Sequence, residues 1–207
     1  MELTDRQADA LTELINIAFG RTASALSDLT GHRVMLDPPL VTVLGFDQLA
    51  TMLGRYVPGD VASIHQEFAG PIAGDALLIL SEAGAVALTG MLTDAAQRAE
   101  RLDESSREVL TEVGNILLNA CLSMFGNLLN VRVTFSVPQL RLESVDALMS
   151  SLPRVGALKR HAIIVSMAFK VKGSTVAGYL ALVLGVASLE HLITEVEAWE
   201  ARGEPTV

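Results

Sequence analysis

The sequence contains few of the residues that mark common catalytic and binding sites. Its single cysteine, Cys121, excludes an intramolecular disulfide, and its place in an apolar helix sector favours a core residue over a catalytic thiol. The four histidines are dispersed without a pair at helical spacing, which disfavours a zinc site. The sixteen glycines form no G-x-G-x-x-G or G-x-x-x-x-G-K loop, so nucleotide binding has no support.

Long apolar runs and an excess of positive charge are also lacking. The longest uninterrupted apolar run, residues 176–187, is shorter than the roughly 18 residues that a membrane-spanning helix needs. The chain starts with acidic and polar residues, unlike a signal peptide, and together with the single cysteine this predicts a cytoplasmic protein. A formal net charge of −9 disfavours binding to nucleic acid or to an anionic membrane and favours a protein partner.

The chain contains an internal repeat. A shift of 99 residues sets Glu13 on Glu112 and Asn16 on Asn115, and residues 3–41 then show eleven identities with their copy. Only five asparagines occur in 207 residues, so two matched asparagines beside two matched glutamates indicate more than an ordinary solvent-exposed face. A repeat of this length predicts a duplicated fold.

The repeat also predicts the domain organisation. Residues 74–80 resemble residues 178–184, so the similarity extends into the later part of each copy. A half of about 100 residues would bury a smaller fraction of its surface alone than the whole chain does. We therefore expect a single domain, residues 1–207, that consists of two repeats, residues 1–98 and 99–207, around one core.

Hydrophobic periodicity predicts the same element order, α-β-α-β-β-α, in both repeats. In the first repeat the expected helices span residues 3–29, 47–53 and 82–92, and the expected strands lie in residues 32–44, with an interruption at Pro38 and Pro39, 61–68 and 76–80. In the second repeat the expected helices span residues 103–125, 145–151 and 187–201, and the expected strands lie in residues 131–137, 162–169 and 175–184. Joined edge to edge, these strands predict an α+β fold with one mostly antiparallel sheet of about six strands, two long signature helices on one face and pseudo-twofold symmetry.

Each long helix carries an ordered row of polar residues. The first ridge consists of Asp9, Glu13, Asn16 and Gly20, and the second ridge consists of Glu108, Glu112, Asn115 and Asn119. Both rows have spacings of four, three and four residues, which place their members on one side of a helix. The second ridge contains carboxylates and carboxamides but no Lys or Arg, which indicates a site.

The opposite side of the second long helix is apolar. At about 100° per residue, one face carries a stripe that is expected to cover the sheet while the ridge faces solvent. The stripe is wide: its predicted members are Val109, Val113, Ile116, Ala120 and Met124, with Leu110, Leu117 and Cys121 beside them.

The best candidates for a site are the ridge residues that both repeats share. Two carboxylates could divide acid and base roles, but an exposed ridge lacks the burial that separates such roles, which disfavours glycosidase-like chemistry. A carboxamide can instead accept a hydrogen from water and donate another to a phosphoryl oxygen, while a glutamate binds a cation on the protein that carries the phosphoryl group. Asn119, whose counterpart is Gly20, is interpreted as context. The candidate catalytic residues are Glu13, Asn16, Glu112 and Asn115, with Asp9 and Glu108 as supporting residues.

The segments around both pairs resemble a known signature. Residues 111–117, Thr-Glu-Val-Gly-Asn-Ile-Leu, and residues 12–27 resemble the paired signature helices of the CheC family of chemotaxis phosphatases, to which CheX and FliY are related. The family pattern is an Asp or Ser, three residues, Glu, two residues and Asn. Two positions depart from it: Glu108 replaces the Asp or Ser, and Ile15 replaces the glycine that the second copy keeps as Gly114.

The resemblance implies hydrolysis of the aspartyl phosphate on a CheY-like response regulator. It assigns Glu13 and Glu112 to an ion pair with a lysine of the regulator, and Asn16 and Asn115 to orientation of the attacking water. It implies no cofactor on this chain, Mg²⁺ on the partner regulator, and the receptor deamidase CheD as a further partner. Two other interpretations stay open: a non-catalytic binding module for a response regulator, CheD or the flagellar switch, and a duplicated domain with no site.

Overall fold

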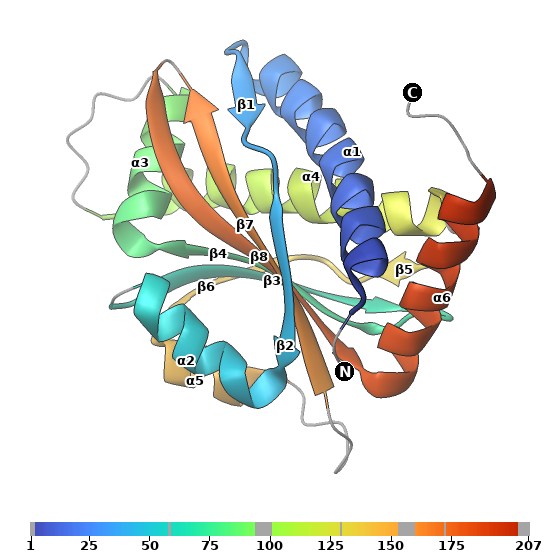
Figure 1. Cartoon of the computed structure of the whole chain (residues 1–207). Helices are drawn as coiled ribbons and strands as arrows, with labels where there is room; N and C mark the ends of the chain where they lie inside the picture. Colours follow the sequence, from blue (N-terminus) through green and yellow to red (C-terminus); the bar gives the residue numbers. More distant parts are fainter. Residues whose placement is uncertain are drawn as a thin grey trace.

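A computed structural model of the protein describes residues 3–57, 59–93, 101–128, 130–152, 160–171 and 173–202. Six helices lie in these ranges: α1 (Asp5–Thr30), α2 (Phe46–Tyr56), α3 (Glu82–Thr93), α4 (Glu104–Leu128), α5 (Val145–Ser151) and α6 (Val186–Arg202). The strands there are β1 (Val34–Leu36), β2 (Leu40–Gly45), β3 (Val61–Ala69), β4 (Gly74–Ser81), β5 (Thr134–Phe135), β6 (Gln139–Glu143), β7 (Arg160–Val171) and β8 (Ser174–Gly185). The order α-β-β-α-β-β-α therefore occurs twice along the chain (Figure 1).

The strands form one antiparallel sheet. Its hydrogen-bonded order is β1-β7-β8-β4-β3-β5, and β2 also pairs with β7 while β6 also pairs with β3. The long strands β7 and β8 form a hairpin, β3 and β4 form another, and β4 pairs with β8 to join the two hairpins at the centre of the sheet. The predicted mostly antiparallel sheet is confirmed.

The number of strands differs from the prediction, because the sheet has eight strands and not about six. Pro38 and Pro39 separate β1 from β2, and Pro138 separates β5 from β6. Proline has no N–H to donate to a ladder, so each edge consists of two shorter strands on the same neighbour. The interruption at Pro38 and Pro39 was predicted, whereas β6 was not. The single strand predicted for residues 131–137 is wrong, since only Thr134–Phe135 pairs within that range.

Helices cover both faces of the sheet. Leu78 and Leu180 point to a large core that they share with α1, α3, α4 and α6, whereas Ile79 and Ala181 point to a smaller core under α2 and α5. This alternation follows from the two-residue period of a strand. Because both faces are covered, the central strands are apolar almost without interruption. The two long helices α1 and α4 lie on the same face, as predicted, and contact each other (Figure 1).

The ends of α1 are set by local chemistry. Thr4 accepts a hydrogen bond from the backbone N–H of Gln7, whose side chain in turn accepts from the N–H of Thr4, which is a capping box. Gly31 ends the helix with φ at 68°, a left-handed conformation that glycine adopts without a steric penalty. The helix therefore presents the whole first ridge in regular α-helical geometry.

Two further observations bear on the sequence-based expectations. No helix in the described part of the chain is long and apolar enough to cross a membrane.

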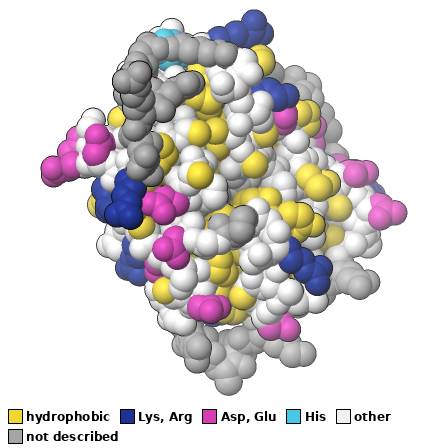
Figure 2. All heavy atoms as spheres, turned by 90° about the vertical axis from the view of Figure 1, so that its left-hand side faces the viewer, with side chains coloured by type: hydrophobic (Ala, Val, Ile, Leu, Met, Phe, Trp, Pro, Cys, Tyr) yellow, Lys and Arg dark blue, Asp and Glu magenta, His cyan; other side chains and the backbone are white. Residues whose placement is uncertain are grey.

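On the face shown in Figure 2, acidic and basic side chains lie interspersed around smaller hydrophobic areas, so both signs of charge are presented there despite the net charge of −9. The predicted boundary between residues 98 and 99 lies outside the described residues, and the pseudo-twofold symmetry stays a prediction.

Candidate functional site

The structure places every candidate residue on α1 or α4. Asp9 and Asn16 are exposed and Glu13 is half-buried on α1, while Glu108 and Glu112 are exposed on α4. Asn115, in contrast, is half-buried, because the second ridge turns toward the sheet along its length. The expectation that both ridges face solvent therefore holds for the first ridge except the half-buried Glu13, and for the start of the second ridge only.

The buried side of α4 differs from the predicted stripe. Val113 and Met124 are buried as expected, but Val109, Ile116 and Ala120 are only half-buried. The fully buried positions are centred about one residue away, at Leu110, Gly114, Leu117, Leu118 and Cys121. Leu110, Leu117 and Cys121 are therefore buried as predicted, whereas Gly114, which has no side chain, and Leu118 were not among the predicted members.

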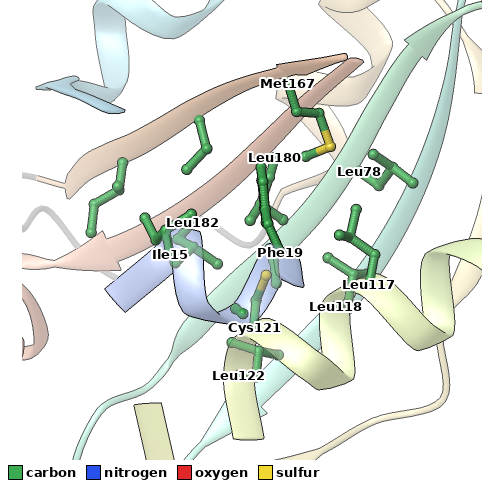
Figure 3. Packing of buried hydrophobic residues seen from close by; sticks show 14 of the residues in the cluster. Ile15, Phe19, Leu78, Leu117, Leu118, Cys121, Leu122, Met167, Leu180 and Leu182 are labelled. Carbon is green, nitrogen blue, oxygen red and sulfur yellow. The ribbon is translucent and has the colours of Figure 1, made fainter. Parts of the chain in front are cut away.

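The core between the two long helices is tightly filled. Figure 3 shows Ile15 and Phe19 of α1 in the same cluster as Leu118 and Cys121 of α4, together with residues of the strands. Burial raises the pKa of the Cys121 thiol to about 12, so the thiol stays neutral and unreactive near pH 7. The interpretation of Cys121 as a core residue is confirmed.

Gly114 lets α4 approach β3 closely. A Cβ atom added at Gly114 would lie 2.7 Å from Cγ2 and 2.9 Å from Cβ of Ile64. The counterpart on α1, Ile15, instead fills the core with its own side chain and is fully buried. At this position α1 therefore packs on the core through the side chain of Ile15, whereas α4 packs through its backbone at Gly114.

A chain of hydrogen bonds runs from the sheet to the second ridge. The side chain of Gln66 on β3, only 1% exposed, donates from Nε2 to Oδ1 of Asn119 at 3.0 Å. Asn119 donates from Nδ2 to Oδ1 of Asn115 at 2.6 Å. Asn115 then points its Nδ2 toward Oε2 of Glu112, at a distance of 3.5 Å where a hydrogen bond is weak.

The close approach of α4 to β3 at Gly114 keeps Asn119 within hydrogen-bond distance of Gln66. α4 meets β3 at two places, at Gly114 against Ile64 and at Asn119 against Gln66. A side chain at residue 114 would displace α4 from the strand that carries Gln66.

Gln66 was not among the predicted site residues, and Asn119, interpreted as context, joins it to Asn115. The contact joins residues 53 positions apart, so no local pattern could reveal it. One signal was present: Gln66 alternates with Ile64 and Phe68, which are both buried, and a polar residue on such a face needs a hydrogen-bond partner.

Other polar groups are placed away from the ridges. His65 Nε2 lies 2.8 Å from Oδ1 of Asp75, between the neighbouring strands β3 and β4. Within the described ranges, no group of three or more His, Cys, Asp or Glu side chains could hold a metal ion.

Comparison with known proteins identifies the family. No family model matches the chain. The chain is 30% identical over 170 residues to the CheY-P phosphatase CheC of Bacillus subtilis, and the match covers 79% of each protein. The chain belongs to the CheC family. The resemblance that the paired helices indicated is thereby confirmed.

More distant matches agree with this family. The chain is 23% identical over 146 residues to the flagellar motor switch phosphatase FliY of B. subtilis, a match that covers 70% of this chain but only 38% of FliY. The crystal structure of Thermotoga maritima FliY covers 99% of the chain with a TM-score of 0.77 at 18% identity. The middle domain of Helicobacter pylori FliM covers 93% with a TM-score of 0.65 at 12% identity. These structures confirm the predicted fold class of this CheC-family member.

Proposed function

We propose that this protein hydrolyses the aspartyl phosphate of a CheY-like response regulator. Family membership supports phosphatase chemistry of this class. The observation that carries the proposal further is the geometry of the second ridge, where Glu112 and Asn115 lie one turn apart on α4 with their side chains toward each other. An acid and an amide so placed can engage a cation and a water molecule at the same time.

The carboxamides have the central role in this reaction. Asn16 or Asn115 accepts a hydrogen bond from a water molecule and donates one to a phosphoryl oxygen, which holds the water in line with the scissile bond. The water oxygen forms a bond to phosphorus, the bond from phosphorus to the aspartyl oxygen breaks, and the aspartate leaves as a carboxylate. The proton of the water passes to the phosphate product or to solvent.

The glutamates dock the regulator. Glu13 and Glu112 form ion pairs with a lysine beside the phosphorylated aspartate, so that α1 or α4 covers the phosphoryl group. Mg²⁺ belongs to the regulator, and this chain contributes position rather than a nucleophile or a metal site. The reaction then needs only a fixed amide and a docked acid from this protein.

The test is a double substitution. Replacing Asn16 and Asn115 together by alanine removes both water-positioning amides, and the rate of regulator dephosphorylation should fall about a hundredfold, as is common when a preorganised polar group is lost. Substitution of Glu13 and Glu112 should instead weaken binding of the regulator. An unchanged rate in the double asparagine variant would refute the assignment, provided that its unfolding midpoint matches that of the wild type.

The same assay separates the alternatives. A complex with a response regulator, CheD or a flagellar switch component that forms without faster phosphate release would establish a binding module. Partner affinity that does not respond to substitution of Glu13 and Glu112 would indicate a duplicated domain whose ridges are not sites.

A further inference from the structure

The orientation of Gln66 is fixed by a backbone carbonyl. Its Nε2 donates to the carbonyl oxygen of Ser136 at 2.9 Å as well as to Asn119. Ser136 is itself held by Glu67 of β3: its N–H donates to the Glu67 carbonyl, and its hydroxyl oxygen accepts from the Glu67 N–H, both at 2.9 Å. Because a carbonyl can only accept, Gln66 must present its nitrogen there.

This fixed nitrogen sets the orientation of the next two amides. Gln66 donates to Asn119, so Asn119 must face it with oxygen and face Asn115 with nitrogen. Asn115 must then face Asn119 with oxygen, which turns its own NH₂ group toward Glu112 and solvent. The second lone pair of this oxygen remains to accept a hydrogen from the attacking water. The two ends of a carboxamide look alike in shape, and here the chain of donors and acceptors decides between them.

The amide oxygen of Gln66 lowers the stability of the folded protein. Its Oε1 is buried and has no hydrogen-bond partner among the described residues. A buried acceptor without a partner is destabilising, and an apolar residue of similar size would avoid the penalty. What distinguishes Gln66 from an apolar residue is therefore its Nε2, which donates to Ser136 and to Asn119.

The first ridge has no counterpart of the two amides, Gln66 and Asn119, that support Asn115. Gly20 is the counterpart of Asn119 at the 99-residue offset. The counterpart of Gln66 is Val165. Residues 74–80 match residues 178–184, so Ala76 matches Leu180, and the residues paired with them across each hairpin are Gln66 and Val165. Glycine and valine side chains form no hydrogen bonds, so Asn16 has no amide relay behind it.

We propose that Gln66 and Asn119 are positioning residues for Asn115, and that the second ridge is therefore the faster of two unequal phosphatase sites. This inference rests on the proposed function. A fixed amide does not lose rotamer freedom when it engages the water and the phosphoryl group, whereas the exposed Asn16 must be ordered at each encounter. Ordering one polar side chain corresponds to a rate difference of roughly three- to tenfold.

The experiment measures each site separately. Asn16→Ala leaves only the second ridge, and Asn115→Ala leaves only the first ridge. In the Asn16→Ala protein, Gln66→Met should lower kcat for regulator dephosphorylation about three- to tenfold with little change in KM. In the Asn115→Ala protein, the same substitution should change the rate less than twofold. Methionine keeps the length of glutamine and removes the unpartnered oxygen, so the fold should persist.

A second substitution tests the orientation directly. Asn119→Asp keeps the shape of the side chain, but a carboxylate can only accept, so it should draw the NH₂ group of Asn115 inward. The second-ridge kcat should then fall further than in Asn119→Ala, although a residue with a merely structural role would tolerate aspartate better than alanine. Measurement at two salt concentrations separates the effect of the added charge.

The outcomes distinguish the two proposals. If the wild type does not accelerate phosphate release, the proposed function fails and this inference fails with it. If the wild type is active but Gln66→Met and Asn119→Asp retain the second-ridge rate, or if both ridges respond equally, only the positioning proposal is overturned. Loss of a distinct NMR signal for the Asn115 NH₂ group in Gln66→Met would support it independently of activity.

Discussion

Replacing Gly114 by alanine should destabilise the protein, although alanine favours helices. The new Cβ would meet Ile64 at 2.7–2.9 Å, and the atoms it meets include Cβ of Ile64, which cannot move without the backbone of β3. That strand pairs with β4 on one side and with β5 and β6 on the other, so it has little freedom. Overpacking of this kind costs about 1–3 kcal/mol.

Gly20→Ala on α1 is the matched control. Gly20 is also inside a long helix, and a Cβ there meets nothing within 4 Å. Both substitutions gain about 1 kcal/mol of helix propensity, so the difference between them isolates the contact with Ile64. We expect Gly20→Ala to be the more stable variant by about 1–3 kcal/mol.

Urea unfolding measures this difference. With an m-value of about 2 kcal/mol/M, the midpoints of the two variants should differ by roughly 0.5–1.5 M. Gly114→Ala should also separate Gln66 from Asn119 and lower the second-ridge rate. Equal stabilisation by the two alanines would show that α4 does not lie against β3 as described.

Three other predictions follow from the described geometry. The Cys121 thiol, whose pKa burial raises to about 12, should resist alkylation in the folded protein and react on unfolding; rapid native labelling would contradict its burial. The hydrogen bonds from Ser106 hold the pKa of Asp103 below its ordinary 3.8, so the stabilisation of the α4 start is present above about pH 4 and lost as the pH falls through the lowered pKa; unfolding midpoints of Asp103→Asn should lack this dependence. Phe19→Ala should lower the free energy of unfolding by about 3–5 kcal/mol, and a smaller loss in urea titration would argue against the packing of α1.

The sequence predicted the fold well where the signal is local. Hydrophobic periodicity and capping residues located all six helices, and the alternation of apolar residues located both long hairpins. The break at Pro38 and Pro39 was predicted, although the segments on its two sides were counted as one strand, whereas β6, which begins after Pro138, was not predicted. β1 and β5, with three and two residues, are too short to give a two-residue pattern of their own, so only pairing with β7 or β3 reveals them.

The candidate site was predictable in part. The internal repeat identified the positions of Glu13, Asn16, Glu112 and Asn115, and their catalytic roles stay predictions. Repetition could not reveal Gln66, because a feature present in only one copy leaves no matched counterpart. The difference between the two ridges depends on a contact between β3 and α4 that is distant in sequence.

The most direct test of the central claim is the rate of phosphate release from the CheY-like regulator of the same organism. The regulator is phosphorylated with a small phosphodonor in the presence of Mg²⁺, and release is followed with and without this protein at catalytic concentration. The account predicts multiple turnovers and a rate well above that of the regulator alone. A rate equal to that of the regulator alone, with the complex formed, would contradict it.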